Sequence, residues 1–407
     1  MRSGMVTGPL LAIVVIGLGI LYHEHMQGNF HKLKAKMETE HQDAPVLRPG
    51  GQEAITLTRT RLVGDSMPEF LSATMLPGRG MNVLQITAYI PGEGEISLLA
   101  SPSAEDATKA MTGTGEDANG KASLAMGGAF EVPWADGIWS TTSTPGKRET
   151  LVWRGQAIQL PVAEGTAVAK GGLMLALPSD SADSVVLPDG GNAQAIFHTG
   201  DFGGRWPSKT DVTVTMLLSS RSIDFTVTAR NVGGEPEPIG IGWHPRFVIP
   251  NGNRDRERLR IPGEKRVEVR DHTKGQPTGV LLPVAGTQYD FTARGGTPLG
   301  RMDLDDCFVA LHQNLLEPGP VAELSNTGSS YGLRLIALSP TIKAMHVVAP
   351  ANSDYLSVEP QYNYDDPFGR EWGKDTDTGM VVLQPGQSTE WKVRLELYTV
   401  QPGGSTM

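Results

Sequence analysis

Residues 223–230 read IDFTVTAR, a stretch in which apolar and polar side chains alternate strictly. Successive side chains of a β-strand point to opposite faces, so this period of two predicts a strand with one buried face. The same alternation returns near the carboxyl terminus, where residues 391–397 read WKVRLEL. Weaker versions occupy residues 55–63, 82–90, 211–218 and 331–338. We therefore predict an all-β fold built from many antiparallel strands.

Composition and turn chemistry support this fold class. The chain has 407 residues, of which 49 are glycine and 29 are proline, and this content favours tight turns over long helices. One internal segment, Ser103 to Met111, is predicted to be helical, because Ser103 can cap it and Asp106 follows three residues later. The length suits one large domain with an appendage. No glycine-rich phosphate loop opens a helix, so the sequence gives nucleotide-dependent chemistry no support.

Charge and cysteine content exclude several classes of function. The formal net charge is −10 and no long basic run is present, which argues against a nucleic-acid partner. Cys307 is the single cysteine, so neither an intramolecular disulfide nor a multi-cysteine zinc site can form. No metal site is therefore predicted.

The amino-terminal segment predicts a membrane anchor. Residues 6–22 carry no charge, and a helix of this length covers roughly 26 Å of a hydrocarbon core of about 30 Å. The alternative is a cleaved secretory signal, but no small-residue cleavage site follows Gly19. We predict that residues 1–45 form an anchor and stalk and residues 46–407 the β domain. The charges on the two sides of this segment favour opposite orientations. We expect a periplasmic or otherwise extracytoplasmic domain.

Three segments in the carboxy-terminal half concentrate ionisable and aromatic residues: 240–247 (GIGWHPRF), 304–308 (LDDCF) and 355–362 (YLSVEPQY). His244 precedes a proline, which favours an extended backbone, and its imidazole can exchange a proton near neutral pH. Glu359 also precedes a proline and has aromatic neighbours that could raise its pKa. Each has an ordinary alternative, because a lone histidine at a strand end is commonly structural.

In their order and spacing these segments resemble the aldose 1-epimerase, or galactose mutarotase, family. The likeness runs from about Leu76 to Val400 and begins with a Leu-Pro-x-x-Gly opening at residues 76–80. It implies a large antiparallel β-sandwich of the supersandwich type, with a groove that holds a sugar. It also implies isomerase activity in carbohydrate metabolism, with a small-molecule sugar as the partner and no cofactor.

The resemblance also implies roles for individual residues. Glu359 matches the family's general base, His244 its general acid and Asp305 a residue that hydrogen-bonds the sugar hydroxyls. The base would take the anomeric proton while the acid protonates the ring oxygen, so that the ring opens and closes on the other face. The aromatic residues expected to pack against the sugar are Trp243, Phe247, Tyr362 and Tyr364.

Three positions depart from the family pattern. Gly137 stands where the family has an arginine, and Lys170 stands where it has a second histidine. Lys170 could supply the missing donor, although an ammonium is a poor geometric substitute for imidazole. Arg246 replaces an aromatic residue and could reach an acidic or phosphorylated sugar, with a surface salt bridge as the alternative. These losses leave a second hypothesis open: a carbohydrate-binding protein on the same fold without turnover.

Overall fold

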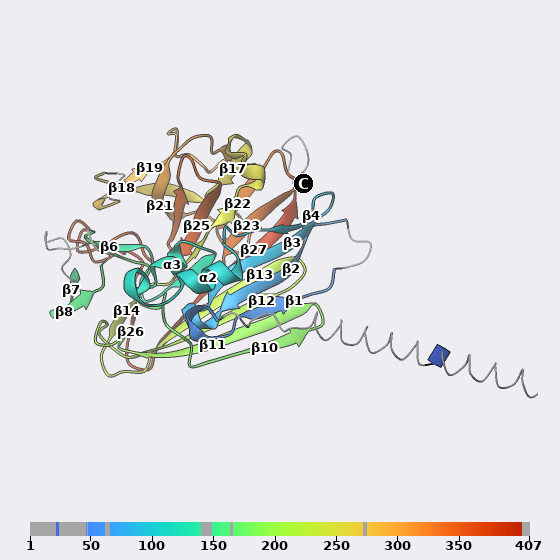
Figure 1. Cartoon of the computed structure of the whole chain (residues 1–407). Helices are drawn as coiled ribbons and strands as arrows, with labels where there is room; N and C mark the ends of the chain where they lie inside the picture. The colour runs from blue at the N-terminus through green and yellow to red at the C-terminus, as the bar shows by residue number, and fades with distance from the viewer. Residues whose placement is uncertain are drawn as a thin grey trace, which may run out of the picture. The chain divides into compact units, whose positions relative to one another are not determined.

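Two large antiparallel sheets form most of the protein (Figure 1). The computed structural model describes residues 22–23, 46, 48–61, 66–139, 149–162, 166–271 and 275–400. The chain divides into a unit of Met1–Val46 and a unit of Leu47–Met407. Almost all of the predicted anchor, residues 6–22, lies outside the described residues. Among the residues that are described, no helix has the length and apolarity needed to cross a membrane.

The first sheet has twelve strands and carries the three segments that the sequence singles out. Its central order is β5-β15-β25-β24-β21. Its strands are β1 (Ile55–Thr58), β2 (Glu69–Leu76), β3 (Asn82–Ile90), β4 (Gly94–Ser97), β5 (Gly128–Glu131), β15 (Gly242–Pro245), β16 (Phe247–Val248), β18 (Gly263–Val269), β19 (Pro277–Pro283), β21 (Leu304–Leu311), β24 (Ala344–Ala349) and β25 (Tyr355–Gln361).

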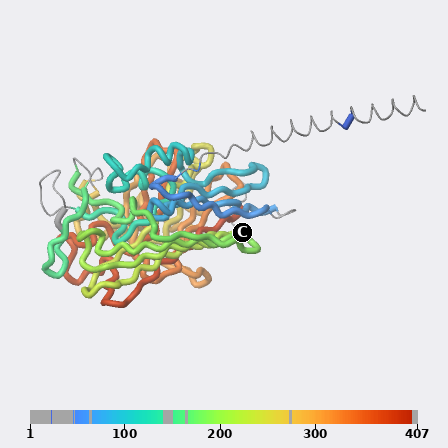
Figure 2. The backbone as a smooth tube through the Cα atoms, turned by 60° about the horizontal axis from the view of Figure 1, so that its bottom comes forward, coloured from blue at the N-terminus to red at the C-terminus, as the bar shows by residue number. Residues whose placement is uncertain are grey.

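The second sheet has nine strands, and its long strands run side by side in Figure 2. They are β10 (Ser181–Leu187), β11 (Gly190–Gly200), β12 (Thr210–Leu218), β13 (Ser222–Asn231), β17 (Glu257–Arg260), β20 (Thr297–Pro298), β22 (Val321–Asn326), β23 (Tyr331–Ala337) and β27 (Ser388–Thr399). Three two-stranded ribbons pair β6 (Gly137–Trp139) with β9 (Val168–Lys170), β7 (Glu149–Trp153) with β8 (Gln156–Leu160), and β14 (Glu237–Ile239) with β26 (Val381–Leu383).

The two sheets pack face to face over one hydrophobic core. On β13 the predicted inward residues Ile223, Phe225, Val227 and Ala229 are all fully buried, which confirms the alternation. The ring of Phe225 lies 4.4 Å from that of Trp243 on the twelve-stranded sheet, measured between centroids. A sandwich follows from this pairing, because each sheet can bury its apolar face only against the other.

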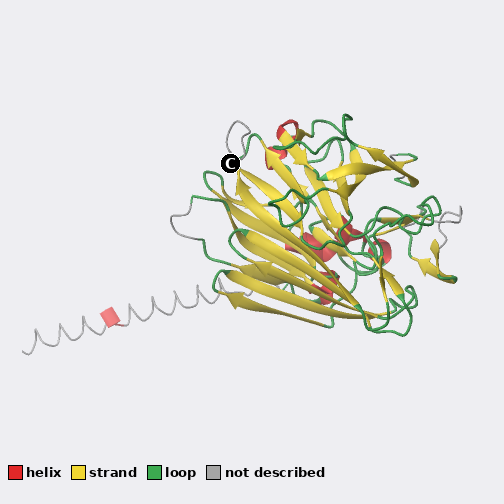
Figure 3. Cartoon of the chain, turned by 180° about the vertical axis from the view of Figure 1, so that it is seen from behind, coloured by secondary structure: helices red, strands yellow, loops and turns green. Residues whose placement is uncertain are grey.

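Helix is a minor component of the described chain, as Figure 3 shows. The α-helices of the β domain are α2 (Ala104–Ala110) and α3 (Lys121–Leu124). The backbone N–H of Asp106 donates to the Ser103 hydroxyl at 3.1 Å, so the predicted cap of α2 is confirmed. The predicted strand at residues 55–63 is shorter than expected and ends at Thr58.

Candidate active site

The site lies on the face of the twelve-stranded sheet that points away from the core. His346 stands directly opposite Glu359 on one neighbouring strand and opposite Cys307 on the other, so the three side chains share one face. Gly242 pairs with Gln361 and with Glu131. His244, two residues beyond Gly242, therefore joins the same face. The intervening residues Trp243, Val347, Val358 and Phe308 belong to the core.

His244 and Glu359 are brought together by this register. Gly242 pairs with Gln361 and Phe247 with Leu356, and continuing that register places His244 beside Glu359. His244 Nδ1 lies 2.9 Å from Glu359 Oε1. The side chain of Glu359 is 2% exposed and that of His244 is 19% exposed. Apart from this contact with His244, Glu359 Oε1 has no hydrogen-bond partner among the described residues.

Electrostatics favours a protonated His244. Burial opposes the charged imidazolium, but the carboxylates of Glu359 and Glu131 outweigh it and raise the pKa of His244. Burial, followed by the nearby charge of Glu359, raises the pKa of Glu131 to about 7. An imidazolium beside a buried carboxylate is the arrangement that a general acid and a general base require.

The ribbon of β6 and β9 contributes a cation to this face. Lys170 pairs with Gly137 across the ribbon, and its Nζ lies 3.5 Å from Asp136 Oδ1. Asp136, together with the more distant Asp305 and Glu359, raises the pKa of Lys170 despite desolvation. A Cβ at Gly137 would lie 2.5 Å from the Trp139 ring, so a larger residue there would have to displace neighbouring side chains. The half-exposed ammonium of Lys170 thus adds a positive charge that acts on Glu359 and His244.

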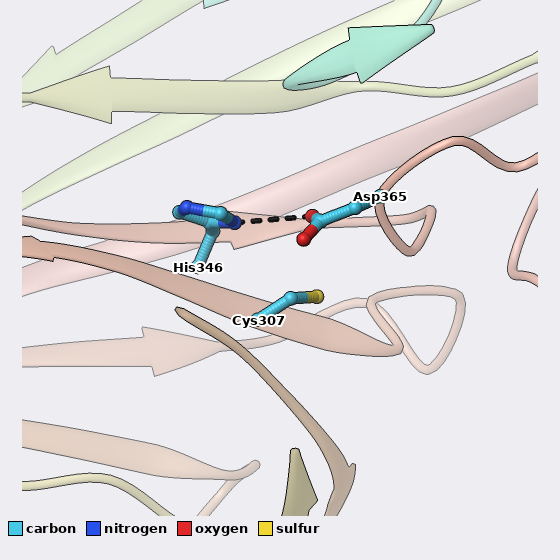
Figure 4. Close-up of side chains that lie close together, drawn as sticks. All are labelled: Cys307, His346 and Asp365. Atoms are coloured by element: carbon cyan, nitrogen blue, oxygen red, sulfur yellow. Dashed lines mark hydrogen bonds and ion pairs between the residues drawn. The ribbon is translucent and has the colours of Figure 1, made fainter. Parts of the chain in front are cut away.

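A second histidine is held between two carboxylates. His346 Nε2 lies 2.7 Å from Asp305 Oδ1. On the other side of the ring, Nδ1 lies 3.1 Å from Asp365 Oδ1, a contact drawn in Figure 4. Burial disfavours the imidazolium, but Asp365 and Asp136 outweigh it and raise the pKa of His346 well above its usual value. Asp305 has a depressed pKa in spite of its burial, because it pairs with His346.

The side chains of Cys307, His346 and Asp365 offer one sulfur, one nitrogen and one oxygen within 4.8 Å of one another. Their chemistry does not fit a metal site. Both ring nitrogens of His346 face carboxylates, so the ring is held as a hydrogen-bond donor rather than as a neutral ligand. Burial raises the pKa of the Cys307 thiol, which disfavours the thiolate that a metal needs.

Four of the predicted site residues share one charged cluster, and two others do not. His244, Glu359, Asp305 and Lys170 lie close enough to influence one another's ionisation. Trp243 and Tyr362 are fully buried, so their predicted contact with sugar is wrong. The indole of Trp243 donates to the Gly128 carbonyl at 3.1 Å, and the Tyr362 hydroxyl lies 3.1 Å from that of Thr389.

Phe247, a further expected aromatic platform, is also buried in the core, whereas Tyr364 is half-buried and packs edge-on against Trp372. The site-face residues that sequence reasoning missed are Glu131, Asp136, His346 and Asp365. His346 did leave a signal, since it is the lone polar residue in the apolar run AMHVVA of β24. A single polar residue in an otherwise apolar strand is therefore a candidate for a functional site.

Comparison with known proteins points to one family. A family model described as aldose 1-epimerase matches residues 147–396. A maltose epimerase of Levilactobacillus brevis is 27% identical over 143 residues, a match that covers 33% of this chain and 40% of that protein. The chain therefore matches less than half the length of this relative.

Solved structures share the fold over most of the chain. A galactose mutarotase-like protein of Clostridium acetobutylicum superposes with a TM-score of 0.67 at 14% identity, covering 84% of this chain and 98% of that one. An aldose epimerase homologue of C. elegans gives a TM-score of 0.62 at 16% identity, covering 86% and 99%. A galactose 1-epimerase of Lactobacillus acidophilus gives 0.58 at 15% identity, covering 86% and 99%.

Proposed function

Because this chain belongs to the aldose 1-epimerase family, we propose that it interconverts the anomers of an aldose by acid-base opening of the sugar ring. The observation that carries the proposal is the contact of 2.9 Å between His244 Nδ1 and Glu359 Oε1 on the outer face of the twelve-stranded sheet. With Nδ1 turned to Glu359, Nε2 is the ring nitrogen left to donate a proton.

The reaction needs two proton transfers and no redox step. Glu359 takes the proton of the anomeric hydroxyl while His244 protonates the ring oxygen, and the bond between the anomeric carbon and that oxygen breaks. The resulting aldehyde rotates, and the hydroxyl formed from the ring oxygen attacks its carbonyl carbon from the other face. This hydroxyl returns its proton to His244, and Glu359 gives its proton to the new anomeric oxygen. The raised pKa of His244 keeps the acid protonated, and Lys170 and Asp305 supply polar groups for the sugar hydroxyls.

NMR exchange spectroscopy and polarimetry of freshly dissolved α-glucose and α-galactose test the proposal. Glu359→Gln keeps the shape and removes the base, so we expect a loss of about 10²- to 10⁴-fold in kcat/KM. Glu237→Gln is the matched control, because Glu237 is also fully buried but bonds Thr210 elsewhere in the fold. If Glu359→Gln relaxes the anomers as fast as the unchanged chain does, Glu359 is not the base.

A second candidate is a sugar-binding protein without turnover. Gly137 favours it, because this position cannot offer the arginine that the family resemblance leads one to expect. Sugar binding by titration calorimetry, combined with relaxation no faster than buffer, would establish this alternative. Relaxation above buffer that Glu359→Gln removes would exclude it.

We further propose that residues 6–22 anchor the chain in a membrane and that the β domain lies outside the cytoplasm. The support is the uncharged run of this segment. Fractionation compares the full chain with a chain that begins at residue 46, and the full chain alone should resist extraction from membranes by alkaline carbonate. Recovery of both chains in the soluble fraction would contradict the anchor.

A further inference from the structure

Arg246 belongs to the face that carries His244 and Glu359. The register of Gly242 with Gln361 and of Phe247 with Leu356 places Arg246 opposite Ser357. Both lie two residues from the His244–Glu359 pair along their strands, a step of roughly 7 Å. A side chain at this point can reach the end of a sugar ring whose anomeric carbon lies over His244 and Glu359.

The guanidinium of Arg246 lacks a counter-charge. Its Cζ lies 3.7 Å from the centroid of the Tyr355 ring, and Nη1 donates to the Leu124 carbonyl at 3.4 Å. Nε is buried and has no hydrogen-bond partner. No carboxylate among the described residues lies within 4.0 Å of Arg246, so the salt bridge considered from the sequence is not formed there.

Other arginines stacked on tyrosine differ in this respect. Arg61 lies over Tyr89, Arg266 over Tyr289 and Arg334 over Tyr398, each within 4.2 Å of the ring centroid. Each of the three also contacts a carboxylate, at 3.6 Å for Glu69, 3.1 Å for Asp306 and 2.7 Å for Glu323. Arg246 is thus held by an aromatic ring in the same way, but its charge is left for another partner.

Ser357 adds a second unmet group beside Arg246. Its residue is fully buried, and its hydroxyl has no hydrogen-bond partner. Buried polar groups in folded proteins are almost always paired, and an unpaired one costs about 1–3 kcal/mol. Ser357 is as closed to a ligand as Trp243 and Tyr362, so the half-buried Arg246 is the group of this pair that a ligand can reach.

We propose that Arg246 binds an anionic substituent, a phosphate or a carboxylate, on the aldose whose anomeric centre lies at His244 and Glu359. The planar fork of a guanidinium matches the oxygens of either anion, and stacking on Tyr355 holds the fork in place. The substrate class is therefore an acidic aldose, and this inference rests on the proposed epimerase function.

NMR exchange rates and calorimetric affinities for glucose, glucose 6-phosphate and glucuronic acid test the inference on the full chain. The unchanged protein should prefer one of the two acidic sugars to glucose. Arg246→Gln should lower kcat/KM and affinity for that sugar by about 10- to 100-fold and leave glucose within about twofold. Comparing the phosphate with the carboxylate identifies which anion is recognised.

The matched control is Arg334→Gln, which removes a stacked arginine from β23 of the other large sheet. It should leave the preference for the acidic sugar unchanged. The inference is overturned if glucose and the acidic sugars behave alike, or if Arg246→Gln weakens all three equally. Turnover of glucose without an acidic preference would refute the inference alone, whereas Arg246-dependent binding of an acidic sugar without turnover would refute the epimerase alone.

Discussion

His244 and His346 flank Glu359 on the same sheet face, yet their surroundings give them different tasks. His346 is 3% exposed and both its nitrogens face aspartates, so its ring is fixed in orientation and charge. His244 has its Nδ1 near one carboxylate and retains partial exposure. We therefore propose that His244 transfers the proton and that His346 positions Asp305.

Glu131 adds to the negative charge that Glu359 places beside His244, and this predicts a shift in the pH profile. Glu131 has a pKa of about 7, and its negative form helps to keep His244 protonated as the pH rises. Glu131→Gln removes that charge, so the pKa of His244 should fall. The alkaline limb of kcat/KM, measured by NMR exchange from pH 5 to 10, should then move to lower pH. An unchanged limb, or a shift to higher pH, would show that Glu131 does not act on the acid.

At the scale of the element, alternation along the strands assigns one face to chemistry and the other to the core. On β25, Tyr355, Ser357, Glu359 and Gln361 share the site face, while Leu356 and Val358 belong to the core. A slip of one residue would bury the carboxylate in the core and expose the apolar residues. The register of a few strand pairs therefore determines whether a site exists.

The same alternation on β13 predicts very different effects of two neighbouring substitutions. Phe225 is fully buried against Trp243, whereas Thr226 points to the other face of its sheet. Phe225→Ala should lower the free energy of unfolding by about 3–5 kcal/mol, because it leaves a cavity between the sheets. Thr226→Ala should cost less than about 1 kcal/mol. Urea denaturation of both variants checks this, and equal losses would contradict the assigned faces.

At the scale of the molecule, the sandwich also buries carboxyl groups far from the site. Glu257 on β17 is buried, accepts a hydrogen bond from Asn326 Nδ2 at 3.0 Å, and has a pKa that burial raises to about 8. The folded chain thus holds this proton at pH values where the unfolded chain has already lost it. The contribution of Glu257 to stability is greatest below its unfolded pKa and declines as the pH rises towards 8.

Replacing this group should flatten the dependence of stability on pH. Glu257→Gln keeps the hydrogen-bond acceptor but cannot ionise. Between pH 5 and pH 9 the variant should therefore lose less stability than the unchanged chain does. We expect a relative gain of about 1–3 kcal/mol in the free energy of unfolding, measured by urea titration at both values. A loss of stability that is equally steep with pH in both chains would contradict the raised pKa.

The sequence by itself determined the fold class and singled out His244 and Glu359 as candidate site residues. Strict alternation in residues 223–230 and 391–397 specified strands, because each face of a sandwich sheet meets one environment. His244 and Glu359 stood out because a proline follows each and the surrounding segments resemble a known family. These signals are local, so they can be read from the sequence without knowledge of the strand order.

Only the tertiary structure decided what surrounds that pair. Glu131 and Asp136 lie more than 200 residues before His346 and Asp365. The two pairs meet through strand order and connecting loops, which no local pattern encodes. The same register turned Trp243 and Tyr362 into the core. The physical reason is that a strand's period tells which residues share a face, while long-range pairing alone selects which face is buried.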